Sequence, residues 1–338
     1  MPSKKLSQIG ELNLLKELQK RFKKGQHNIL IGIGDDAALL KPPKEDILLT
    51  TDMMVEGVHF DMDYITPYQL GFKLVSINVS DIYAMGGTPR FLLLNLAMNK
   101  NTSKKVYDSF FNGVEKAIHY YKVSLVGGDI SSTNIGMTLS ATIIGHAKKH
   151  IRRSGAKVGD KIYVTGNLGD SACGLALLKN IKTPIPLEKT NILHSKLLAK
   201  ELKWKDTEPL LRRHLLPLAR NPKRYVKYAT SMIDISDGLL IDLSRICDES
   251  KVGARVFIRN IPTSPGLKIA ASYLGISPIR LALSGGEDYE LLFTAKENKK
   301  IRAIYIGDIT ESERVVIDIS GRKRAFSAEG YQHFGAYR

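Results

Sequence analysis

The chain has 338 residues, of which 43% are hydrophobic and 25% are charged, and these globular values together with the length favour two domains. No apolar run approaches the roughly 20 residues of a membrane span, and the first residues lack the apolar core of a signal peptide, so we expect a cytoplasmic protein without membrane contact. The net charge is +16, but the basic residues are scattered without a nucleic-acid-binding motif and the two cysteines form no CxxC pair, which argues against a nucleic-acid partner and against a cysteine-based metal site.

The first half of the chain mixes helical and strand-like patterns. A charged amphipathic pattern predicts a helix near the N-terminus, and two more helices are expected between apolar runs that suit strands. The helices are too few to cover both faces of a sheet, so we expect an α+β domain with helices on one face. In chain order the predicted elements are a helix at 1–24, strands at 28–34 and 46–52, a helix at 67–86, a strand at 91–98, a helix at 103–121, and strands at 123–129 and 136–146.

The second half begins with a basic stretch, AKKHIRRSGAKVGD at 147–160, which we interpret as the crossover into a second domain. It continues with the strand KIYVTG, a glycine-initiated helix in NLGDSACGLALLKN, the strand SMIDIS and the helix DGLLIDLSRICDES. Residues 181–230 are rich in proline and carry the least information. We therefore expect an N-terminal α/β domain over 1–148 and a C-terminal α/β domain over 149–338.

Acidic residues recur beside glycines, mostly at the ends of predicted strands or in strand-to-helix turns, where the side chains converge on one edge of a sheet. One of them, Asp81, follows Leu74 and Ile77 at helical spacing and precedes Met85, which puts it on the apolar stripe of its helix. A buried carboxylate needs a cation, either a Lys or Arg side chain or a metal ion. The whole set comprises Asp35, Asp36, Asp52, Asp81, Asp129, Asp234, Asp237, Glu287 and Asp288.

A site of carboxylate oxygens favours Mg²⁺ or Mn²⁺ over zinc, and magnesium commonly bridges phosphate oxygens. The glycine-rich turns GNLGDS (166–171) and VGGD (126–129) offer backbone N–H groups to a phosphate. There is no GxxxxGK[ST] segment and no HRD loop, which excludes a P-loop enzyme and a protein kinase. Asp237 can alternatively cap the helix that follows it, but this alternative does not explain Asp234.

Seven motifs occur in a fixed order: GIGDDAAL, TTDMMVEGVHF, VSINVSDIYAMGGTPRFLLLNL, LVGGDIS, RSGAKVGD, IDISDGL and SGGEDYELLFT. Through them the whole chain resembles the thiamine-monophosphate kinase family, in the superfamily of aminoimidazole ribonucleotide synthetase and selenophosphate synthetase. The resemblance implies two α/β domains of the aminoimidazole ribonucleotide synthetase-like type, and a homodimer in which the N-terminal sheets pair. It also implies that ATP and several Mg²⁺ ions serve the direct in-line phosphorylation of thiamine phosphate to thiamine diphosphate.

The resemblance also implies roles for single residues. The metal ligands are expected to be Asp35, Thr50, Thr51, Asp52, Asp81, Asp129, Asp234 and Asp237. The ATP contacts are expected to be Phe111, Gly128, Asp129, Arg153 and Ser236. The substrate contacts are expected to be His59, Glu287 and Tyr331. The residues expected to serve phosphoryl transfer itself are Asp35, Asp52, Asp81, Asp129, Asp234 and Arg153.

Some features depart from the family pattern. Phe111 stands where the pattern suggests a tyrosine, so only ring packing on the nucleotide is expected there, and residues 181–230 match weakly. Selenophosphate synthetase, which has a reactive cysteine or selenocysteine near its N-terminus, is disfavoured because no cysteine precedes Cys173. The hydrogenase-maturation relative, which ends in a cysteine motif, is disfavoured because this chain ends in FGAYR. A rival hypothesis, a basic nucleic-acid-binding module, leaves the acidic set without a role.

Overall fold

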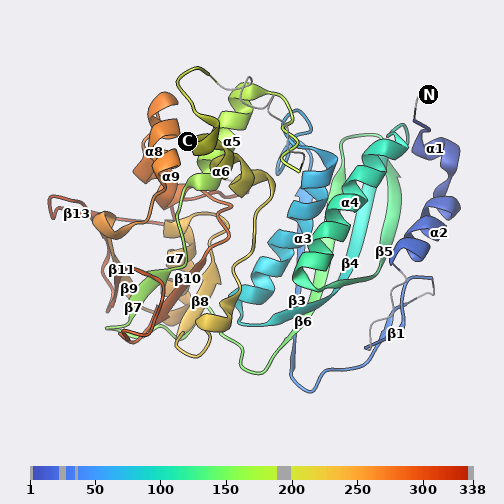
Figure 1. Ribbon diagram of the computed structural model, residues 1–338. Helices are drawn as coiled ribbons and strands as arrows, with labels where there is room; N and C mark the ends of the chain where they lie inside the picture. The colour runs from blue at the N-terminus through green and yellow to red at the C-terminus, as the bar shows by residue number, and fades with distance from the viewer. Residues whose placement is uncertain (1–2, 23–27, 35–36, 189–198, 334–338) are drawn as a thin grey trace. The chain divides into compact units, whose positions relative to one another are not determined.

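The computed structural model contains two compact units, which we call the N-terminal and C-terminal units (Figure 1). The described residues are 3–22, 28–34, 37–188 and 199–333. The N-terminal unit spans Met1–Ile82, Gly87–Lys148 and Pro184–Pro186, and the C-terminal unit spans Tyr83–Gly86, Lys149–Thr183 and Leu187–Arg338. Within the described ranges, no helix has the length and apolar character needed to cross a membrane.

The N-terminal unit is built on a four-stranded sheet in the order β3-β6-β4-β5. Its members are β3 (Asp46–Val55), β4 (Thr88–Asn99), β5 (Ser124–Thr133) and β6 (Thr138–Ala147). β4 and β5 are parallel, whereas β6 pairs antiparallel with both β3 and β4. Along β6, buried and half-buried residues alternate, as expected for a strand with one face in the core. The short strands β1 (Ile29–Ile31) and β2 (Leu39–Leu40) form a separate pair.

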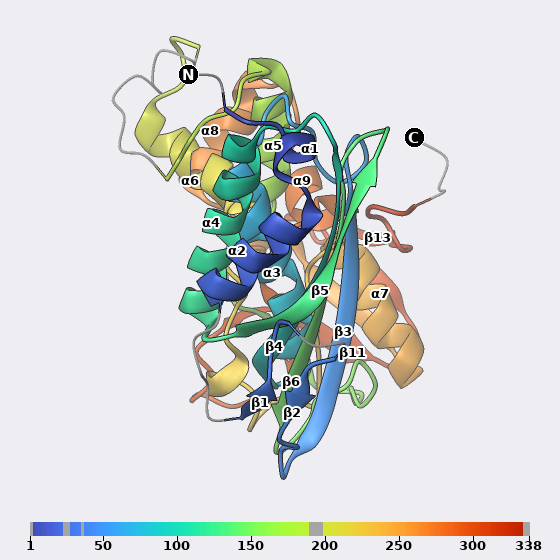
Figure 2. The ribbon, with the colours of Figure 1, turned by 90° about the vertical axis from the view of Figure 1, so that its right-hand side faces the viewer.

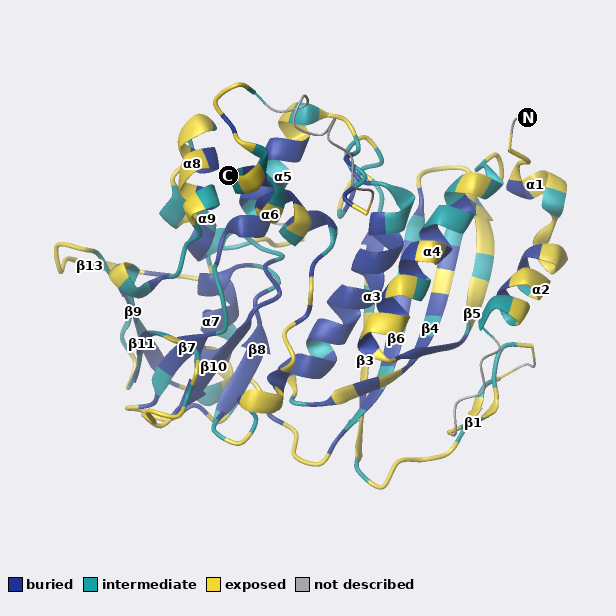
Figure 3. Cartoon of the chain, viewed as in Figure 1, coloured by how far each residue is buried: buried dark blue, intermediate teal, exposed yellow. Residues whose placement is uncertain are grey.

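The helices of this unit lie along one face of the sheet (Figure 2). They are α1 (Leu6–Ile9), α2 (Glu11–Phe22), α3 (Pro67–Ala84) and α4 (Lys104–Tyr121). Ser103 caps α4 by accepting a hydrogen bond from the backbone N–H of Val106. α3 is apolar around most of its circumference and is buried along most of its length (Figure 3).

Two glycines bring α3 and α4 into backbone contact. A Cβ atom on Gly71 would lie 2.1 Å from the carbonyl oxygen of Phe110, and one on Gly113 would lie 1.9 Å from that of Tyr68. The opposite face of the sheet carries exposed apolar side chains on β3: Ile47, Leu49 and Met53 are 61%, 69% and 57% exposed. One face of the sheet therefore belongs to the core, and the other presents apolar surface.

The C-terminal unit contains a seven-stranded sheet in the order β13-β12-β9-β11-β7-β10-β8. β12 and β9 are parallel and the other pairs are antiparallel. The strands are β7 (Lys161–Val164), β8 (Ser231–Asp234), β9 (Gly253–Phe257), β10 (Leu291–Ala295), β11 (Ile304–Thr310), β12 (Arg314–Ile317) and β13 (Lys323–Ala325). The helices are α5 (Asp170–Ile181), α6 (Trp204–Leu215), α7 (Leu239–Ser250), α8 (Pro265–Tyr273) and α9 (Pro278–Ser284), with 3₁₀ turns at Pro222–Arg224 and Ile258–Asn260. A core cluster that includes Ile162, Val164, Leu240 and Leu292 joins sheet and helices.

The predicted elements can be compared with this fold directly. The helices expected at 67–86 and 103–121 are confirmed within two residues at each end. The single helix expected over 1–24 is wrong in one respect, because Gly10 adopts a φ of +79° and separates α1 from α2. The strand expected at 28–34 is shorter, covering Ile29–Ile31, and residues 181–230 contain helix α6 despite their prolines.

Candidate functional site

The first group of candidate residues lies where strand β3 faces helix α3. The hydroxyl of Thr50 donates a 2.6 Å hydrogen bond to Oδ2 of Asp81, and the backbone N–H of Asp52 donates a 3.1 Å hydrogen bond to Oδ1 of Asn78. Thr50, Asp52 and Asp81 are all half-buried. Because alternate residues of a strand share a face, Thr50 and Asp52 both face the C-terminal part of the helix.

The helical stripe predicts a buried Asp81, and this prediction is only partly right. Leu74 is fully buried and Ile77 is 9% exposed, but Met85 is 38% exposed just beyond the helix end. The stripe thus reaches the surface near Asp81, and the Thr50 hydroxyl gives the carboxylate a polar partner. Burial alone therefore does not require a cation beside Asp81, and that expectation is corrected.

Two further predicted ligands, Thr51 and Asp129, lie on the other face of the sheet. In the register of the four strands, Asp52 aligns through β6 and β4 with Gly128, the residue before Asp129. Aligned residues share a face and neighbours along a strand alternate, so Asp129 and Thr51 both face away from the helices. The Thr51 hydroxyl instead lies 2.9 Å from that of Thr142. The expectation of one side-chain cluster joining Thr51 and Asp129 to Asp52 is thus corrected for this unit.

The oxygen atoms of this unit can supply part of the coordination shell of a magnesium ion. Among the described residues no group of three or more His, Cys, Asp or Glu side chains could hold a metal ion, and Asp35 lies outside those residues. Magnesium usually takes one or two protein carboxylates and completes its shell with water and substrate phosphates. The hydroxyl–carboxylate pair of Thr50 and Asp81, with Asp52 on the same strand face, has the chemistry for this.

His59 lies in the turn after β3 with its ring held by the backbone. The N–H of Val55 donates a 3.0 Å hydrogen bond to Nδ1 of His59, and the N–H of His59 donates to the carbonyl of Val55 at 2.9 Å. Because Nδ1 accepts, a neutral His59 ring carries its hydrogen on Nε2. His59 can therefore act as an Nε2–H donor to an anionic group.

Gly128 and Phe111 are the two residues of this unit, besides Asp129, that were expected to contact ATP, and their surroundings differ. Gly128 has a φ of +144°, and a Cβ atom there would lie 1.9 Å from the carbonyl oxygen of Leu94, so the position accepts only glycine. Phe111 is 1% exposed, with its ring centroid 4.7 Å from that of Tyr107 and 5.3 Å from that of Phe110. Its ring is part of the core, and the expectation that it packs on a nucleotide is corrected.

In the C-terminal unit, backbone hydrogen bonds join three of the predicted segments. The N–H of Glu287 donates to the carbonyl of Ser236 at 2.7 Å, and the N–H of Tyr331 donates to the carbonyl of Asp237 at 3.0 Å. Asp234 is 3% exposed at the end of β8, immediately before this turn. The sequence intervals between these segments do not predict these hydrogen bonds, which the structure shows. Arg153, of the same unit, is exposed.

The turn Ser236–Gly238 is organised by Asp242, a residue that the sequence analysis did not single out. Oδ2 of this fully buried carboxylate accepts hydrogen bonds from the backbone N–H groups of Ser236, Asp237 and Gly238 at 3.1–3.2 Å. Arg245 joins it to Asp237, whose Oδ2 lies 2.7 Å from Nη2 of the arginine. Burial raises the pKa of Asp242 to about 6, against the opposing charge of Arg245. The one feature of the sequence that points to Asp242 is its place in the first turn of the predicted helix, where an acidic residue is favourable.

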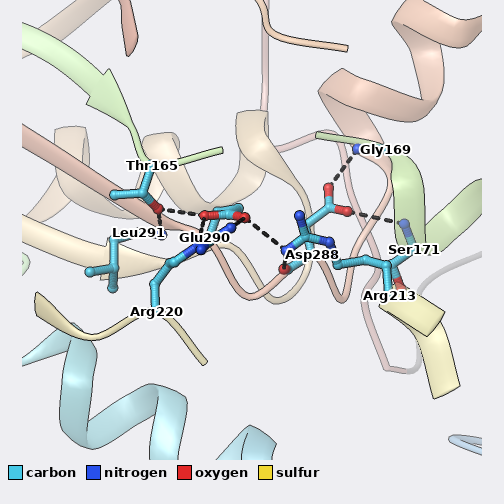
Figure 4. Close-up of polar contacts among 8 residues, drawn as sticks. All are labelled: Thr165, Gly169, Ser171, Arg213, Arg220, Asp288, Glu290 and Leu291. Atoms are coloured by element: carbon cyan, nitrogen blue, oxygen red, sulfur yellow. Dashed lines mark hydrogen bonds and ion pairs between the residues drawn. The ribbon is translucent and has the colours of Figure 1, made fainter. Parts of the chain in front are cut away.

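Two buried carboxylates anchor the segment that follows Glu287 (Figure 4). Asp288 accepts hydrogen bonds from the backbone N–H groups of Gly169 and Ser171, at 2.6 and 3.1 Å, at the start of α5. Burial raises the pKa of Asp288 to about 7, although these donors act in the opposite direction. The carboxylate therefore ties the segment to the glycine-rich turn GNLGDS.

Glu290 is the second anchor and is fully buried. It accepts hydrogen bonds from Thr165 at 2.6 Å, Arg213 at 2.7 Å and Arg220 at 2.6 Å (Figure 4). Burial acts to raise the pKa of Glu290, but the hydrogen bond from Arg220 and the charges of both arginines outweigh it and hold the pKa below its usual range. The segment therefore has fixed points on both sides of Tyr289.

Glu287 itself is half-buried and has a left-handed backbone, with φ of +65°. One of its carboxylate oxygens, Oε2, lies 3.0 Å from Nδ1 of the buried His214 on α6. Tyr331 is 42% exposed, and its hydroxyl lies 3.2 Å from Nδ1 of His333. This unit thus offers a carboxylate and an aromatic ring on segments that hydrogen-bond to the same turn.

Comparisons with known proteins agree with this organisation. The family models described as AIR synthase related protein, N-terminal domain, and AIR synthase related protein, C-terminal domain, match residues 34–147 and 157–320. A thiamine-monophosphate kinase of Aquifex aeolicus is 36% identical over 98% of this chain and 100% of that protein, and one of Buchnera aphidicola subsp. Schizaphis graminum is 37% identical over 97% and 99%. The solved structure of AaThiL complexed with AMPPCP and TMP has a TM-score of 0.73 and 33% identity over 98% of this chain and 99% of that one. The expected fold class is confirmed.

Proposed function

Since the chain belongs to the thiamine-monophosphate kinase family, we propose that it transfers the γ-phosphate of ATP to thiamine monophosphate, giving thiamine diphosphate and ADP. The observation that carries this proposal is the nearly full-length similarity to AaThiL, which was solved with AMPPCP and TMP. AMPPCP is an ATP analogue with a non-hydrolysable β–γ link, and we take TMP to be thiamine monophosphate. A nucleotide and the acceptor then occupy one protein together, as direct transfer requires.

We assign the phosphate chemistry to acidic residues of both domains. The N-terminal domain, residues 1–148, contributes metal and phosphate ligands and dimer contacts, and the C-terminal domain, residues 149–338, completes the nucleotide and substrate site. The residues that would hold Mg²⁺ are Asp35, Thr50, Asp52, Asp81, Asp234 and Asp237. When bound, magnesium supplies positive charge that offsets the phosphate charges. Gly128, Arg153 and Ser236 are assigned to the nucleotide.

We assign the acceptor to His59, Glu287 and Tyr331. Thiamine monophosphate carries an anionic phosphate and a cationic thiazolium ring. The Nε2–H group of His59 suits the phosphate, because the ring already accepts a hydrogen bond at Nδ1. The carboxylate of Glu287 and the exposed ring of Tyr331 suit the cationic heterocycle.

In the proposed reaction, an oxygen of the thiamine-bound phosphate attacks the γ-phosphorus of ATP. A new P–O bond forms, the bond from the γ-phosphorus to the bridging oxygen breaks, and ADP leaves. Two anions must approach, so positioning and charge cancellation, to which Arg153 contributes, supply the catalysis. A covalent intermediate on a cysteine is disfavoured, because burial raises the pKa of Cys173 to about 12 and that of Cys247 to about 11, which makes both thiols poor nucleophiles.

We further propose a homodimer that pairs the N-terminal sheets, and a cytoplasmic location where ATP is available. The support for the dimer is the exposed apolar face of β3, with Ile47, Leu49 and Met53. Burying such a face against a second copy removes apolar surface from water.

The proposed activity is tested by incubating the protein with ATP, magnesium and thiamine monophosphate. We expect thiamine diphosphate and ADP to appear in equal amounts, as measured by liquid chromatography. ATP consumption without thiamine diphosphate would contradict the proposal and indicate the activity of a sister family.

A further inference from the structure

His214 is a buried histidine on helix α6 that contacts the candidate substrate residue Glu287. It is 2% exposed, and its Nδ1 atom lies 3.0 Å from Oε2 of Glu287 and 3.2 Å from Oγ of Ser171. An ionised carboxylate only accepts hydrogen bonds, so Nδ1 of His214 carries the hydrogen in this contact. The histidine therefore fixes one oxygen of the Glu287 carboxylate.

The backbone of Glu287 is fixed independently of this contact. Its φ of +65° is a conformation that side-chain-bearing residues adopt only when their surroundings hold them there. The N–H of Glu287 bonds to Ser236, and the carboxylates of Asp288 and Glu290 are tied to α5 and to two arginines. The side-chain torsions of Glu287 are set by contacts at the end of that side chain, and His214 makes one of these contacts.

We propose that His214 is a positioning residue, which holds the Glu287 carboxylate in the orientation that receives the cationic heterocycle of the acceptor. The inference rests on the proposed function, in which Glu287 lines the thiamine pocket. A side chain already ordered before binding loses less conformational entropy when the ligand arrives. Removing the contact should therefore weaken acceptor binding and leave nucleotide binding unchanged.

Asparagine and glutamine provide a matched pair of substitutions. The amide nitrogen of asparagine reaches the position of a histidine Nδ1, whereas that of glutamine reaches the position of Nε2. We expect His214→Asn to keep the KM for thiamine monophosphate within about twofold, and His214→Gln to raise it about three- to tenfold, the range expected for one side chain that must be ordered on binding. The KM for ATP should be the same in both variants. Thr207→Val is a control on the same helix, because Thr207 is buried and its hydroxyl, among the described residues, donates to the carbonyls of Lys203 and Trp204 within its own helix turn.

A double-mutant cycle separates positioning from a general structural role. Glu287→Gln should raise the KM for thiamine monophosphate, and adding His214→Gln to it should have little further effect, because the residue to be positioned is already changed. Equal KM changes for both substrates, or fully additive effects in the cycle, would overturn the inference. If the wild-type protein makes no thiamine diphosphate, the proposed function fails instead.

A second measurement needs no substitution and keeps the test valid if the variants do not fold. In the ¹⁵N spectrum of the wild-type imidazoles, Nδ1 of His214 should be protonated, and its signal should shift when thiamine monophosphate is added without nucleotide. An unprotonated Nδ1, or a signal that responds to ATP but not to thiamine monophosphate, would contradict the proposed role.

Discussion

The hydroxyl of Thr50 lies 2.6 Å from Oδ2 of Asp81, and this contact joins strand β3 to helix α3. It lies within the acidic group of the N-terminal unit, which comprises Thr50, Asp52 and Asp81. The hydroxyl is the donor, because an ionised carboxylate can only accept. The hydrogen bond from Thr50 orients one carboxylate oxygen of Asp81, and the residue is half-buried. Such an arrangement suits a carboxylate that must stay ionised and keep a defined direction.

Replacing Asp81 by asparagine keeps its size and removes its charge. We expect turnover to be lost, because the substituted residue no longer offers an anionic oxygen, while the melting temperature stays the same or rises as repulsion from Asp52 is relieved. Product formation and thermal unfolding measure the two effects. Asp63→Asn, which changes an exposed acid of the same unit, should leave both unchanged. Full activity of Asp81→Asn at saturating magnesium would remove Asp81 from the site.

Glu290→Ala should lower the free energy of unfolding by about 3–5 kcal/mol, because the loss of a buried carboxylate leaves Arg213 and Arg220 without their partner. Urea denaturation measures the change. Arg322→Ala breaks the pair of the exposed Arg322 with the half-buried Asp318 at the surface and serves as the control, with a nearly unchanged unfolding curve. Equal effects of the two substitutions would mean that the buried cluster does not stabilise the unit.

Asp288 should make stability depend on pH. Its folded-state pKa is about 7, above the value of about 4 for an unfolded aspartate, so the folded state binds a proton more tightly. Its contribution is fully present below pH 4 and is lost as the pH rises to 7, by about 4 kcal/mol for a shift of three units. Measured by urea denaturation from pH 4 to 8, the stability of wild type relative to Asp288→Asn should fall with rising pH. A constant difference would show that burial does not perturb this carboxyl.

Tyr331 is expected to present its aromatic face to the cationic heterocycle of the acceptor. Tyr331→Phe keeps the ring and should change the KM for thiamine monophosphate little. Tyr331→Leu loses a cation–π contact of about 0.5–2 kcal/mol, so the KM should rise several-fold while the KM for ATP stays the same. Steady-state kinetics with each substrate varied in turn measures both values. A selective rise in the KM for ATP would assign Tyr331 to the nucleotide instead.

The exposed apolar face of β3 should mediate self-association. Leu49→Lys places a charge on a side chain that is 69% exposed, so the fold itself should tolerate it. We expect the wild-type protein to elute as a dimer and the variant as a monomer in size-exclusion chromatography with light scattering, because burying an unpaired charge is unfavourable. A monomeric wild-type protein would reject the proposed dimer.

The sequence predicts the long helices and strands, but it does not predict how the motif residues are arranged relative to one another. Helix α3 is a long, mostly apolar segment, and α4 has an apolar stripe and a capping serine, so local pattern suffices to find both helices. The face on which Asp129 lies depends on the register of four strands that are distant in sequence, and no local pattern contains that register.

The supporting residues of the C-terminal unit were also beyond local pattern. Asp242 lies in an amphipathic helix and Glu290 directly before a wholly buried strand, and only their burial and their partners distinguish them from other acidic residues. His214 lies in the proline-rich stretch that matched the family weakly, so its contact with Glu287, 73 residues later, could not be inferred from spacing. The backbone hydrogen bonds that join the segments of Glu287 and Tyr331 to the turn at Ser236 and Asp237 likewise depend on the tertiary fold and not on local pattern.

The backbone contacts at Gly71 and Gly113 have a consequence for protein engineering. Exchanging a helical glycine for alanine is a common way to make a protein more heat-resistant, because alanine restricts the unfolded chain. Here a methyl group at either position would collide with a carbonyl oxygen of the facing helix at about 2 Å, and backbone atoms cannot rotate away as a flexible side chain can. Helices α3 and α4 would have to separate, and α3 carries Asp81. A thermostabilisation library for this enzyme should therefore leave both glycines unchanged, since even the smallest side chain would disturb the acidic group along with the core.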